Sequence, residues 1–281
     1  MYLKEAKRTT TNVISRRNLL KASLALSASA VLSGCQFALT DEFKAAIQSE
    51  GGMMDGMASV NGTTLFYTQH GSGIPVMVMH GGLGLDHAYF RPALDRLGDS
   101  ASLVYFDHRG NGRSQEEANW DSITFDDLTK DADELRQALG FDKVVLYGHS
   151  YGGFIAQEYA ARYQDNLAGL ILSNTSPNVT DYEPVMPAWA TDEAMGALGQ
   201  IFSAPMETDE QWGETWSRAL PLYWKDMDED LAADIHARTQ YRAAAWNRGA
   251  QLLGEFQMKG RLQDITVPTL LLSGRLLPPG L

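Results

Sequence analysis

A short run of residues near the middle of the chain has the types and spacing of a nucleophile turn. Ser150 lies between Gly148 and Gly152 in the sequence Gly-His-Ser-Tyr-Gly. Glycines are needed there because a side chain would collide with the neighbouring strand or helix, and the sharp turn leaves the serine hydroxyl exposed at the start of a helix. The pattern predicts that Ser150 attacks a carbonyl carbon. Such a pentapeptide also occurs by chance in a loop, so the flanking elements have to support the prediction.

The segments on both sides of this turn have the required character. Residues 144–146 are Val-Val-Leu, a β-branched apolar run that is typical of a buried strand, and residues 154–162 are apolar at helical spacing. A strand, a sharp turn and a helix are therefore expected to follow one another around Ser150.

The rest of the chain predicts an α/β fold around this turn. A hairpin is expected over residues 59–70, turning at Asn61-Gly62. Further strands and helices then alternate; the strands are expected at 74–79, 103–106, 167–172 and 265–274, and the helices at 90–97 and 124–139, with Thr124 as N-cap. Continuously apolar strands indicate a mostly parallel sheet covered on both faces. Ligands bind at the carboxyl ends of such strands, where His80, Asp107 and Ser150 fall.

The segment between the last two strands has a different composition. It is rich in Trp, Tyr, Met and acidic residues, and helices are expected over 191–203, 210–224 and 231–256. Its aromatic residues are candidates for lining a pocket or for packing with one another: Trp212, Trp216, Tyr223, Trp224, Tyr241 and Trp246. The predicted organisation is therefore a leader (1–35), a linker (36–57), a core (58–177), a helical insertion (178–260) and a return to the core (261–281).

Charge and cysteine content exclude several classes of protein. The chain of 281 residues has a formal charge of −12, and residues 1–35 contribute +5, which leaves −17 for the remainder. Such acidity argues against nucleic acid as a partner of the folded body. The only cysteine is Cys35, so the body has no intrachain disulfide and no cysteine chemistry. We expect no metal site and no cofactor.

The leader resembles a bacterial export signal. Residues 15–21 read Ser-Arg-Arg-Asn-Leu-Leu-Lys, which is similar to the twin-arginine motif, and a short apolar run over 22–32 is too short for a stable membrane span. It ends in Leu32-Ser33-Gly34-Cys35, which resembles a lipobox. The resemblance implies export, cleavage before Cys35 and lipid attachment there, so that the body is tethered to a membrane and faces the periplasm or the cell exterior.

Three motifs make residues 59–274 resemble the α/β-hydrolase superfamily, and within it the proline-iminopeptidase-like branch of peptidase family S33 type. They are HGGLG at 80–84, DHRGNGRS at 107–114 and GHSYGG at 148–153. The resemblance implies a serine hydrolase acting on a small molecule or short peptide, at an ester, amide or N-terminal peptide bond, with residues 178–260 as a cap. Leu83 stands where that branch usually has proline, and His149 and Tyr151 stand where it favours glycine and tryptophan, so the substrate stays open.

The same resemblance assigns roles around the nucleophile. The glycine-rich loop would supply one backbone N–H of an oxyanion hole, from Gly82 or Leu83, and Tyr151 would supply the other. A tight turn without chemistry is the alternative for this loop. Asp107 and Arg109 are expected to fix a turn beside the site and not to take part in chemistry.

The expected acid and histidine of a catalytic triad are missing from their usual positions. The resemblance places both after Ser150, yet the strand at 265–274 is followed by Arg275 and no carboxylate, and Asn174 occupies the alternative acid position. The histidines are His70, His80, His87, His108, His149 and His236. We therefore expect a chain truncated at its C-terminus, lacking its last strand and helix, that is a poor catalyst and a poor folder. The alternatives are a binding lipoprotein on a degenerate hydrolase fold and a cofactor-free haloperoxidase-like enzyme.

Overall fold

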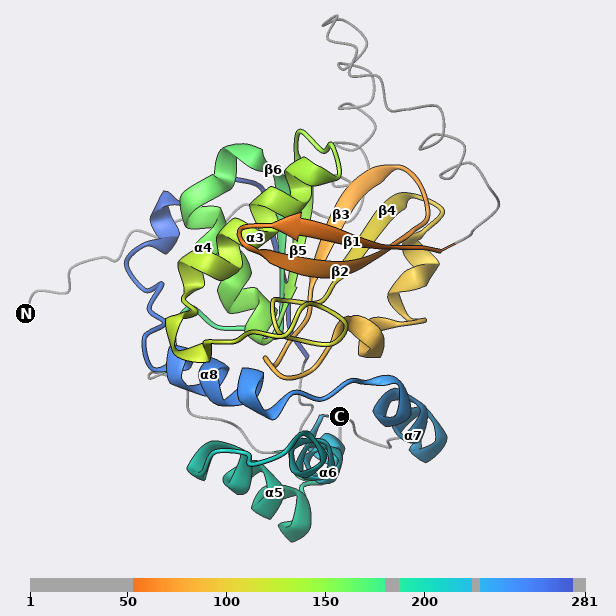
Figure 1. Cartoon of the computed structure of the whole chain (residues 1–281), viewed down its shortest axis with the longest axis vertical. Helices are drawn as coiled ribbons and strands as arrows, with labels where there is room; N and C mark the ends of the chain where they lie inside the picture. Colours follow the sequence, from red (N-terminus) through yellow and green to blue (C-terminus); the bar gives the residue numbers. More distant parts are fainter. Residues whose placement is uncertain (1–52, 180–186, 224–227, 275–281) are drawn as a thin grey trace, which may run out of the picture. The chain divides into compact units, whose positions relative to one another are not determined.

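The computed structural model of the chain describes residues 53–179, 187–223 and 228–274, and it contains one mixed sheet (Figure 1). The sheet order is β1-β2-β4-β3-β5-β6-β7. The strands are β1 (Met54–Val60), β2 (Thr63–His70), β3 (Ile74–Met79), β4 (Ala101–Phe106), β5 (Val144–His149), β6 (Leu167–Ser173) and β7 (Thr269–Leu272). β1 and β2 are antiparallel to their neighbours, and β4, β3, β5, β6 and β7 are parallel. The predicted α/β-hydrolase-like architecture is confirmed for the sheet.

The first hairpin turns where the sequence predicts. Asn61 and Gly62 have φ angles of 42° and 77°, the left-handed region that a two-residue hairpin turn requires. β1 begins at Met54, so the linker predicted for residues 36–57 ends earlier than expected. Its last residues are strand because they pair with β2 in continuous register from Met54 to Val60. The leader, Cys35 and residues up to 52 lie outside the described residues.

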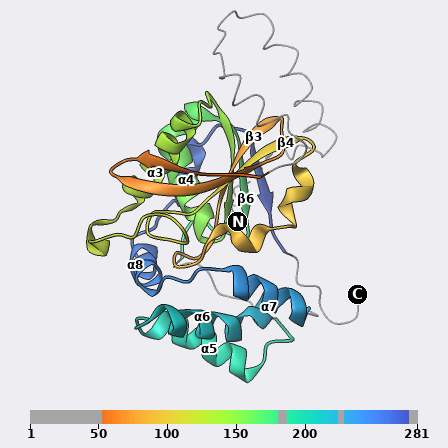
Figure 2. The same cartoon turned by 45° about the vertical axis from the view of Figure 1, so that its right-hand side comes forward.

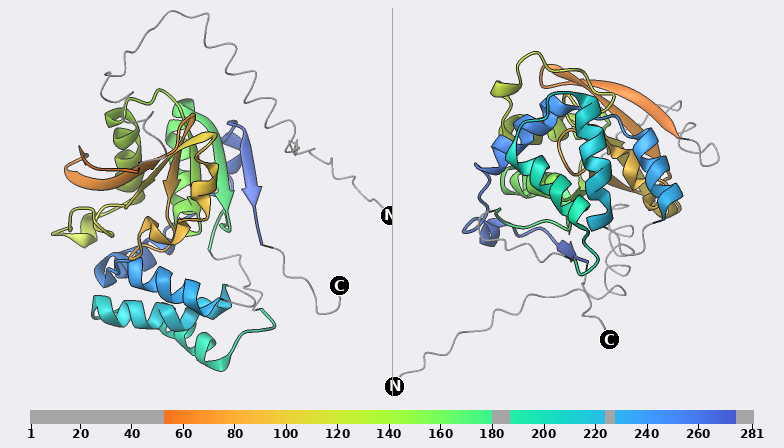
Figure 3. Two further views of the ribbon diagram at one scale, coloured as in Figure 1. Left: turned by 90° about the vertical axis from the view of Figure 1, so that its right-hand side faces the viewer. Right: turned by 90° about the horizontal axis from the view of Figure 1, so that it is seen from below.

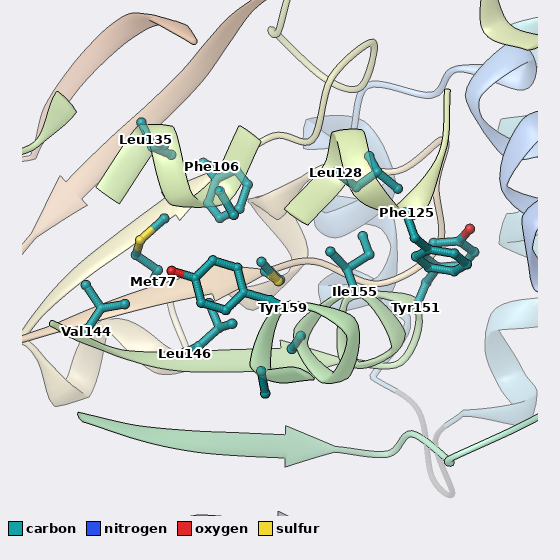
Figure 4. Close-up of a cluster of buried hydrophobic side chains, with 14 of the residues drawn as sticks. Met77, Phe106, Phe125, Leu128, Leu135, Val144, Leu146, Tyr151, Ile155 and Tyr159 are labelled. Atoms are coloured by element: carbon teal, nitrogen blue, oxygen red, sulfur yellow. The ribbon is translucent and has the colours of Figure 1, made fainter. Parts of the chain in front are cut away.

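The central strands are apolar on both faces because both faces are covered. On one face Met77 and Leu146 pack with Leu128 of α3 (Phe125–Ala138) and Ile155 of α4 (Tyr151–Tyr163), as Figure 4 shows. On the other face Val78 joins a separate cluster of buried residues: Phe90, Ala101, Leu103 and Tyr105. This alternation along β3 follows from the two-residue period of a strand.

The helices of the core differ in one place from the prediction. Thr124 caps α3 in a capping box, as expected, by accepting from the Asp127 N–H while the Asp127 carboxylate accepts from the Thr124 N–H. The helix expected at 90–97 is instead two 3₁₀ turns, η1 (His87–Phe90) and η2 (Leu94–Leu97). Pro92 lies between them. Proline has no N–H to donate within a helix, and it disfavours a helical conformation of the preceding residue, Arg91.

The described part of the insertion contains four α-helices and the 3₁₀ turn η5 (Leu220–Leu222). The α-helices are α5 (Asp192–Ser203), α6 (Asp209–Ala219), α7 (Glu229–Arg238) and α8 (Ala243–Leu253). α8 lies between the sheet and the pair α5 and α6 (Figure 2). The single helix expected over 231–256 is wrong, because it is broken between α7 and α8. Two donors that would continue the helix point to the core instead: the Gln240 N–H bonds Asp86 and the Arg242 N–H bonds the Gly84 carbonyl.

β7 ends the sheet in the described part of the chain, and Figure 3 shows it at one side of the molecule. Leu271 is 70% exposed and Leu272 is 43% exposed. The strand predicted at 265–274 is shorter than expected: β7 begins at Thr269, directly after Pro268, which has no N–H to donate to a neighbouring strand. Within the described ranges, no helix is both long and apolar enough to cross a lipid bilayer.

Candidate active site

Ser150 occupies a strained turn between β5 and α4. Its backbone angles are φ 51° and ψ −117°, a conformation that residues other than glycine rarely adopt. The turn is held because the Ser150 N–H donates to the Ser173 carbonyl at 2.9 Å and the Gly153 N–H donates to the Ser150 carbonyl at 2.9 Å. Strain of this kind persists only where the surroundings enforce it, and it is concentrated at functional sites.

The glycines around Ser150 are required by close backbone approach. A Cβ on Gly152 would lie 2.4 Å from the Met79 carbonyl oxygen, and one on Gly148 would lie 2.6 Å from the Gly152 carbonyl oxygen. A Cβ on Gly81 would lie 2.9 Å from the Ser150 Cβ. The nucleophile turn and the loop after β3 are therefore in direct contact, as an active site built from both would need.

The loop of residues 80–84 leaves two backbone donors unused within the described residues. The Gly81 N–H donates to the Tyr89 hydroxyl at 2.5 Å, and the Gly84 N–H donates to Asn111 Oδ1 at 2.5 Å. The N–H groups of Gly82 and Leu83 make no recorded hydrogen bond to the rest of the described chain. These are the two donors that the sequence singles out.

Tyr151 starts α4 directly after Ser150. The first N–H groups of a helix have no partner within it, and Tyr151 is the first residue of this one. Its side chain is buried against Phe125 and donates to the Gly249 carbonyl of α8 at 3.1 Å. The backbone of Tyr151 is thus available to a ligand at the same end of the helix as Ser150, while its side chain is fixed to the insertion.

Tyr89, which sequence reasoning missed, and His149, one of the six histidines that the sequence lists, lie beside Ser150. The Tyr89 hydroxyl accepts from the Gly81 N–H at 2.5 Å and shares a hydrogen bond of 2.8 Å with His149 Nδ1. Burial and the neighbouring His80 lower the pKa of His149 to about 4, so the ring is neutral at pH 7. Burial also raises the pKa of Tyr89. The contact is long-range, and no local sequence signal indicates it.

The buried carboxylate of Asp107 stabilises the turn at the end of β4 by hydrogen bonds. Its Oδ1 accepts from His87 Nδ1 at 2.6 Å and its Oδ2 accepts from the Arg113 N–H at 2.9 Å. Burial alone would raise the pKa of Asp107, but the hydrogen bond from His87 holds it below its usual value. β3 separates β4 from β5 in the sheet, so about 10 Å separates this strand end from that of Ser150. Within the described chain His87 is hydrogen-bonded to Asp107 and not to Ser150.

The other histidines are also hydrogen-bonded away from Ser150. His80 Nδ1 donates to the Gly81 carbonyl, its Nε2 accepts from the His108 N–H, and burial lowers its pKa to about 4. His108 Nε2 bonds the His80 carbonyl, and burial lowers the pKa of His108 well below its usual value. His70 bonds the Asp95 carbonyl, and His236 bonds the Tyr241 hydroxyl. No recorded hydrogen bond within the described chain joins any of the six to Ser150.

The remaining candidates have structural environments. Arg109 makes a two-point contact with Asp131 of α3, with Nε to Oδ2 at 2.6 Å and Nη2 to Oδ1 at 2.5 Å. Asn174 adopts φ 48° after β6, and its Oδ1 accepts from the Gly274 N–H at 3.0 Å, which joins the ends of β6 and β7. Nowhere in the described parts of the chain do His, Cys, Asp or Glu side chains gather in threes that could hold a metal ion.

Most of the aromatic residues of the insertion form its own core. Trp212 and Trp246 are buried and stacked at 4.7 Å between ring centroids, and Trp216 packs against Trp212. Tyr223 is 55% exposed, and Tyr241 bonds His236. Trp224 lies outside the described residues.

Comparison with known proteins identifies proteins that are similar to this chain in sequence and in fold. The sequence family described as alpha/beta hydrolase fold matches residues 74–276. A proline iminopeptidase of Saccharolobus solfataricus is 36% identical over 124 residues, which are 43% of this chain, and the chain spans 40% of that relative's length. The proline iminopeptidase PfmaB of Pestalotiopsis fici is 30% identical over 233 residues, covering 76% of this chain and 80% of the relative. An esterase structure from Exiguobacterium antarcticum, 23% identical, shares the fold with a TM-score of 0.61 over 78% of this chain and 80% of that one.

Proposed function

Because the chain belongs to the α/β hydrolase fold family and is similar to proline iminopeptidases, we propose that it is a serine hydrolase with Ser150 as its nucleophile. The observation that carries this proposal is the conformation of Ser150, at φ 51° and ψ −117° between a strand and a helix. A backbone of that kind presents the hydroxyl at the helix N-terminus, where a carbonyl substrate can approach it.

The neighbouring backbone supports an acyl-transfer reaction. Attack of the Ser150 hydroxyl on a carbonyl carbon places negative charge on the carbonyl oxygen. We assign the stabilisation of that charge to the N–H of Tyr151 and to the N–H of Gly82 or Leu83, because these donors have no other recorded partner in the described chain. The substrate class is a small ester, an amide or the N-terminal peptide bond of a short peptide.

The identity of the general base is the open part of the mechanism. A neutral serine hydroxyl is a weak nucleophile and needs a base within hydrogen-bond reach. The six histidines are each bonded to another group, and His80 and His149 have pKa values of about 4, so neither is a good base near pH 7. We therefore expect slow turnover, because no histidine of the described chain is hydrogen-bonded to Ser150.

A binding protein on the same fold is the second candidate, and the engagement of all six histidines favours it. The two candidates differ in whether Ser150 reacts. The experiment is to treat the chain with a fluorophosphonate and with a panel of p-nitrophenyl esters and proline p-nitroanilide. Ser150→Ala should abolish labelling and turnover, whereas Ser203→Ala, an exposed serine at the end of α5, should leave both unchanged. Labelling that survives in Ser150→Ala would remove Ser150 as nucleophile, and no labelling of the wild type would favour the binding protein.

We also propose that the protein is exported by the twin-arginine route and anchored to a membrane through lipid on Cys35. The proposal rests on Arg16-Arg17 and on the lipobox ending in Cys35. Gln36 follows the cysteine in place of the aspartate that is linked to inner-membrane retention, which favours the outer membrane in a two-membrane bacterium. Labelled palmitate should enter the wild type and not Cys35→Ser, and failure to label the wild type would refute lipidation.

A further inference from the structure

The cap helix α8 contacts both arms of the proposed oxyanion hole at one residue. A Cβ on Gly249 would lie 2.8 Å from the Cβ of Leu83. The helix and the loop can therefore pack this closely because residue 249 has no side chain. The Gly249 carbonyl also accepts from the Tyr151 hydroxyl at 3.1 Å. Leu83 and Tyr151 are 68 positions apart, yet both meet Gly249. A single residue of α8 therefore contacts Leu83 and Tyr151, which lie in the two segments that carry the proposed oxyanion-hole donors.

A second contact fixes the end of the same loop. The Gly84 carbonyl accepts from Trp212 Nε1 at 2.7 Å and from the Arg242 N–H at 3.0 Å, while the Gly84 N–H is held from the core by Asn111. Gly84 has φ 90°, and a Cβ there would lie 2.6 Å from the Arg242 carbonyl oxygen. The loop is thus held between core and cap through its backbone.

We propose that Gly249 and Trp212 are positioning residues for the oxyanion hole, so that the cap sets the reactivity of Ser150 as well as covering it. This inference rests on the proposed function. The physical reason is that backbone donors stabilise an oxyanion only when they lie within a narrow range of distances, and displacement by about 1 Å lowers rates roughly 10²-fold. Residues of the core accept hydrogen bonds from the N–H groups of Gly81 and Gly84. Residues of the cap contact Leu83, Gly84 and Tyr151.

Gly249→Ala tests the contact. The new methyl carbon would lie 2.8 Å from the Leu83 Cβ, closer than side chains approach one another, so Leu83 must shift together with its backbone. The cost of that shift offsets the preference of about 1 kcal/mol for alanine over glycine within a helix. Gly199→Ala is the matched control, because it makes the same change within α5 with nothing inside 4 Å of the new Cβ. We expect Gly249→Ala to lower the maximal rate of fluorophosphonate labelling about tenfold with little change in its half-saturating concentration, and Gly199→Ala to change neither.

Trp212→Phe and Trp246→Phe form the second pair. Both indoles are buried and stacked, but Trp246 Nε1 donates to the Ile201 carbonyl within the cap, whereas Trp212 Nε1 donates to the loop. Hydrogen exchange of the full chain gives a readout that needs no activity. Trp212→Phe should speed amide exchange at Gly84 and Leu85 more than Trp246→Phe does. For the same loss of unfolding free energy, Trp212→Phe should also slow fluorophosphonate labelling more than Trp246→Phe does.

The outcomes separate the two proposals. If the wild type shows no Ser150-dependent labelling, the proposed function fails, and the exchange rates at Gly84 and Leu85 alone decide the positioning role. If the wild type is labelled and Gly249→Ala reacts at the rate of Gly199→Ala, the positioning role of Gly249 is refuted. Equal exchange in Trp212→Phe and Trp246→Phe overturns the role of Trp212.

Discussion

Replacing Gly152 by alanine should destabilise the protein strongly through the contact between α4 and the end of β3. The Cβ would lie 2.4 Å from the Met79 carbonyl oxygen and 2.5 Å from the His80 carbonyl oxygen. A carbon normally approaches a carbonyl oxygen to about 3.3 Å, so roughly 0.8 Å of separation must be gained. Both obstacles are backbone, and no rotamer change relieves them. We expect a loss of about 3 kcal/mol in the free energy of unfolding, at the upper end of overpacking effects.

The control is Gly199→Ala, which should raise the free energy of unfolding by about 1 kcal/mol, since Gly199 lies within α5 and its Cβ would meet open space. Urea unfolding of the full chain at pH 7 measures both, and the loss in Gly152→Ala corresponds to a melting temperature about 6–12 °C lower for a domain of this size. A change of less than 0.5 kcal/mol in Gly152→Ala would refute the steric account of the turn.

Three further predictions concern stability. The pKa of His80 is about 4 in the folded chain and 6.5 in the unfolded chain, so between these values the unfolded chain binds the extra proton. The free energy of unfolding therefore falls as the pH drops below 6.5, by about 2 kcal/mol at pH 5. The difference between the urea midpoints at pH 7 and pH 5 should be smaller in His80→Gln than in the wild type. Asp131→Ala should lower the free energy of unfolding by about 3 kcal/mol because the Arg109 guanidinium loses its partner, and adding Arg109→Met should restore part of it. Tyr151→Phe should lower it by about 1 kcal/mol, measured by thermal denaturation, through loss of the bond to Gly249.

The parts of the fold that could be predicted depend on neighbours along the chain. The hairpin at Asn61-Gly62 follows from residues that tolerate positive φ. The start of α3 follows from Thr124, whose side chain accepts from the N–H three residues later. Strand positions follow from apolar runs. The sheet order, with β4 between β2 and β3, does not follow from any of these signals, because pairing depends on which strands meet in three dimensions.

The insertion shows the limit of helical periodicity. Residues 231–256 have the spacing of one helix, yet the helix ends at Arg238 and a new one starts at Ala243. The N–H of Gln240 goes to the Asp86 carboxylate, and burial and Asp107 raise the pKa of Asp86 to about 6. A tertiary hydrogen bond therefore replaces a helical one, and the periodicity within the segment carries no information about its partner.

The sequence by itself predicted two short groups of candidate-site residues: Ser150 with Tyr151, and the glycines of the loop before Leu85. Both groups were recognised because a motif is formed by residues that are neighbours along the chain. Only the tertiary structure decided that Tyr89 is hydrogen-bonded to His149 beside Ser150 and that Leu83 and Tyr151 both contact Gly249. The physical reason is that these contacts join residues tens of positions apart, where burial and available donors, not spacing along the chain, select the partner.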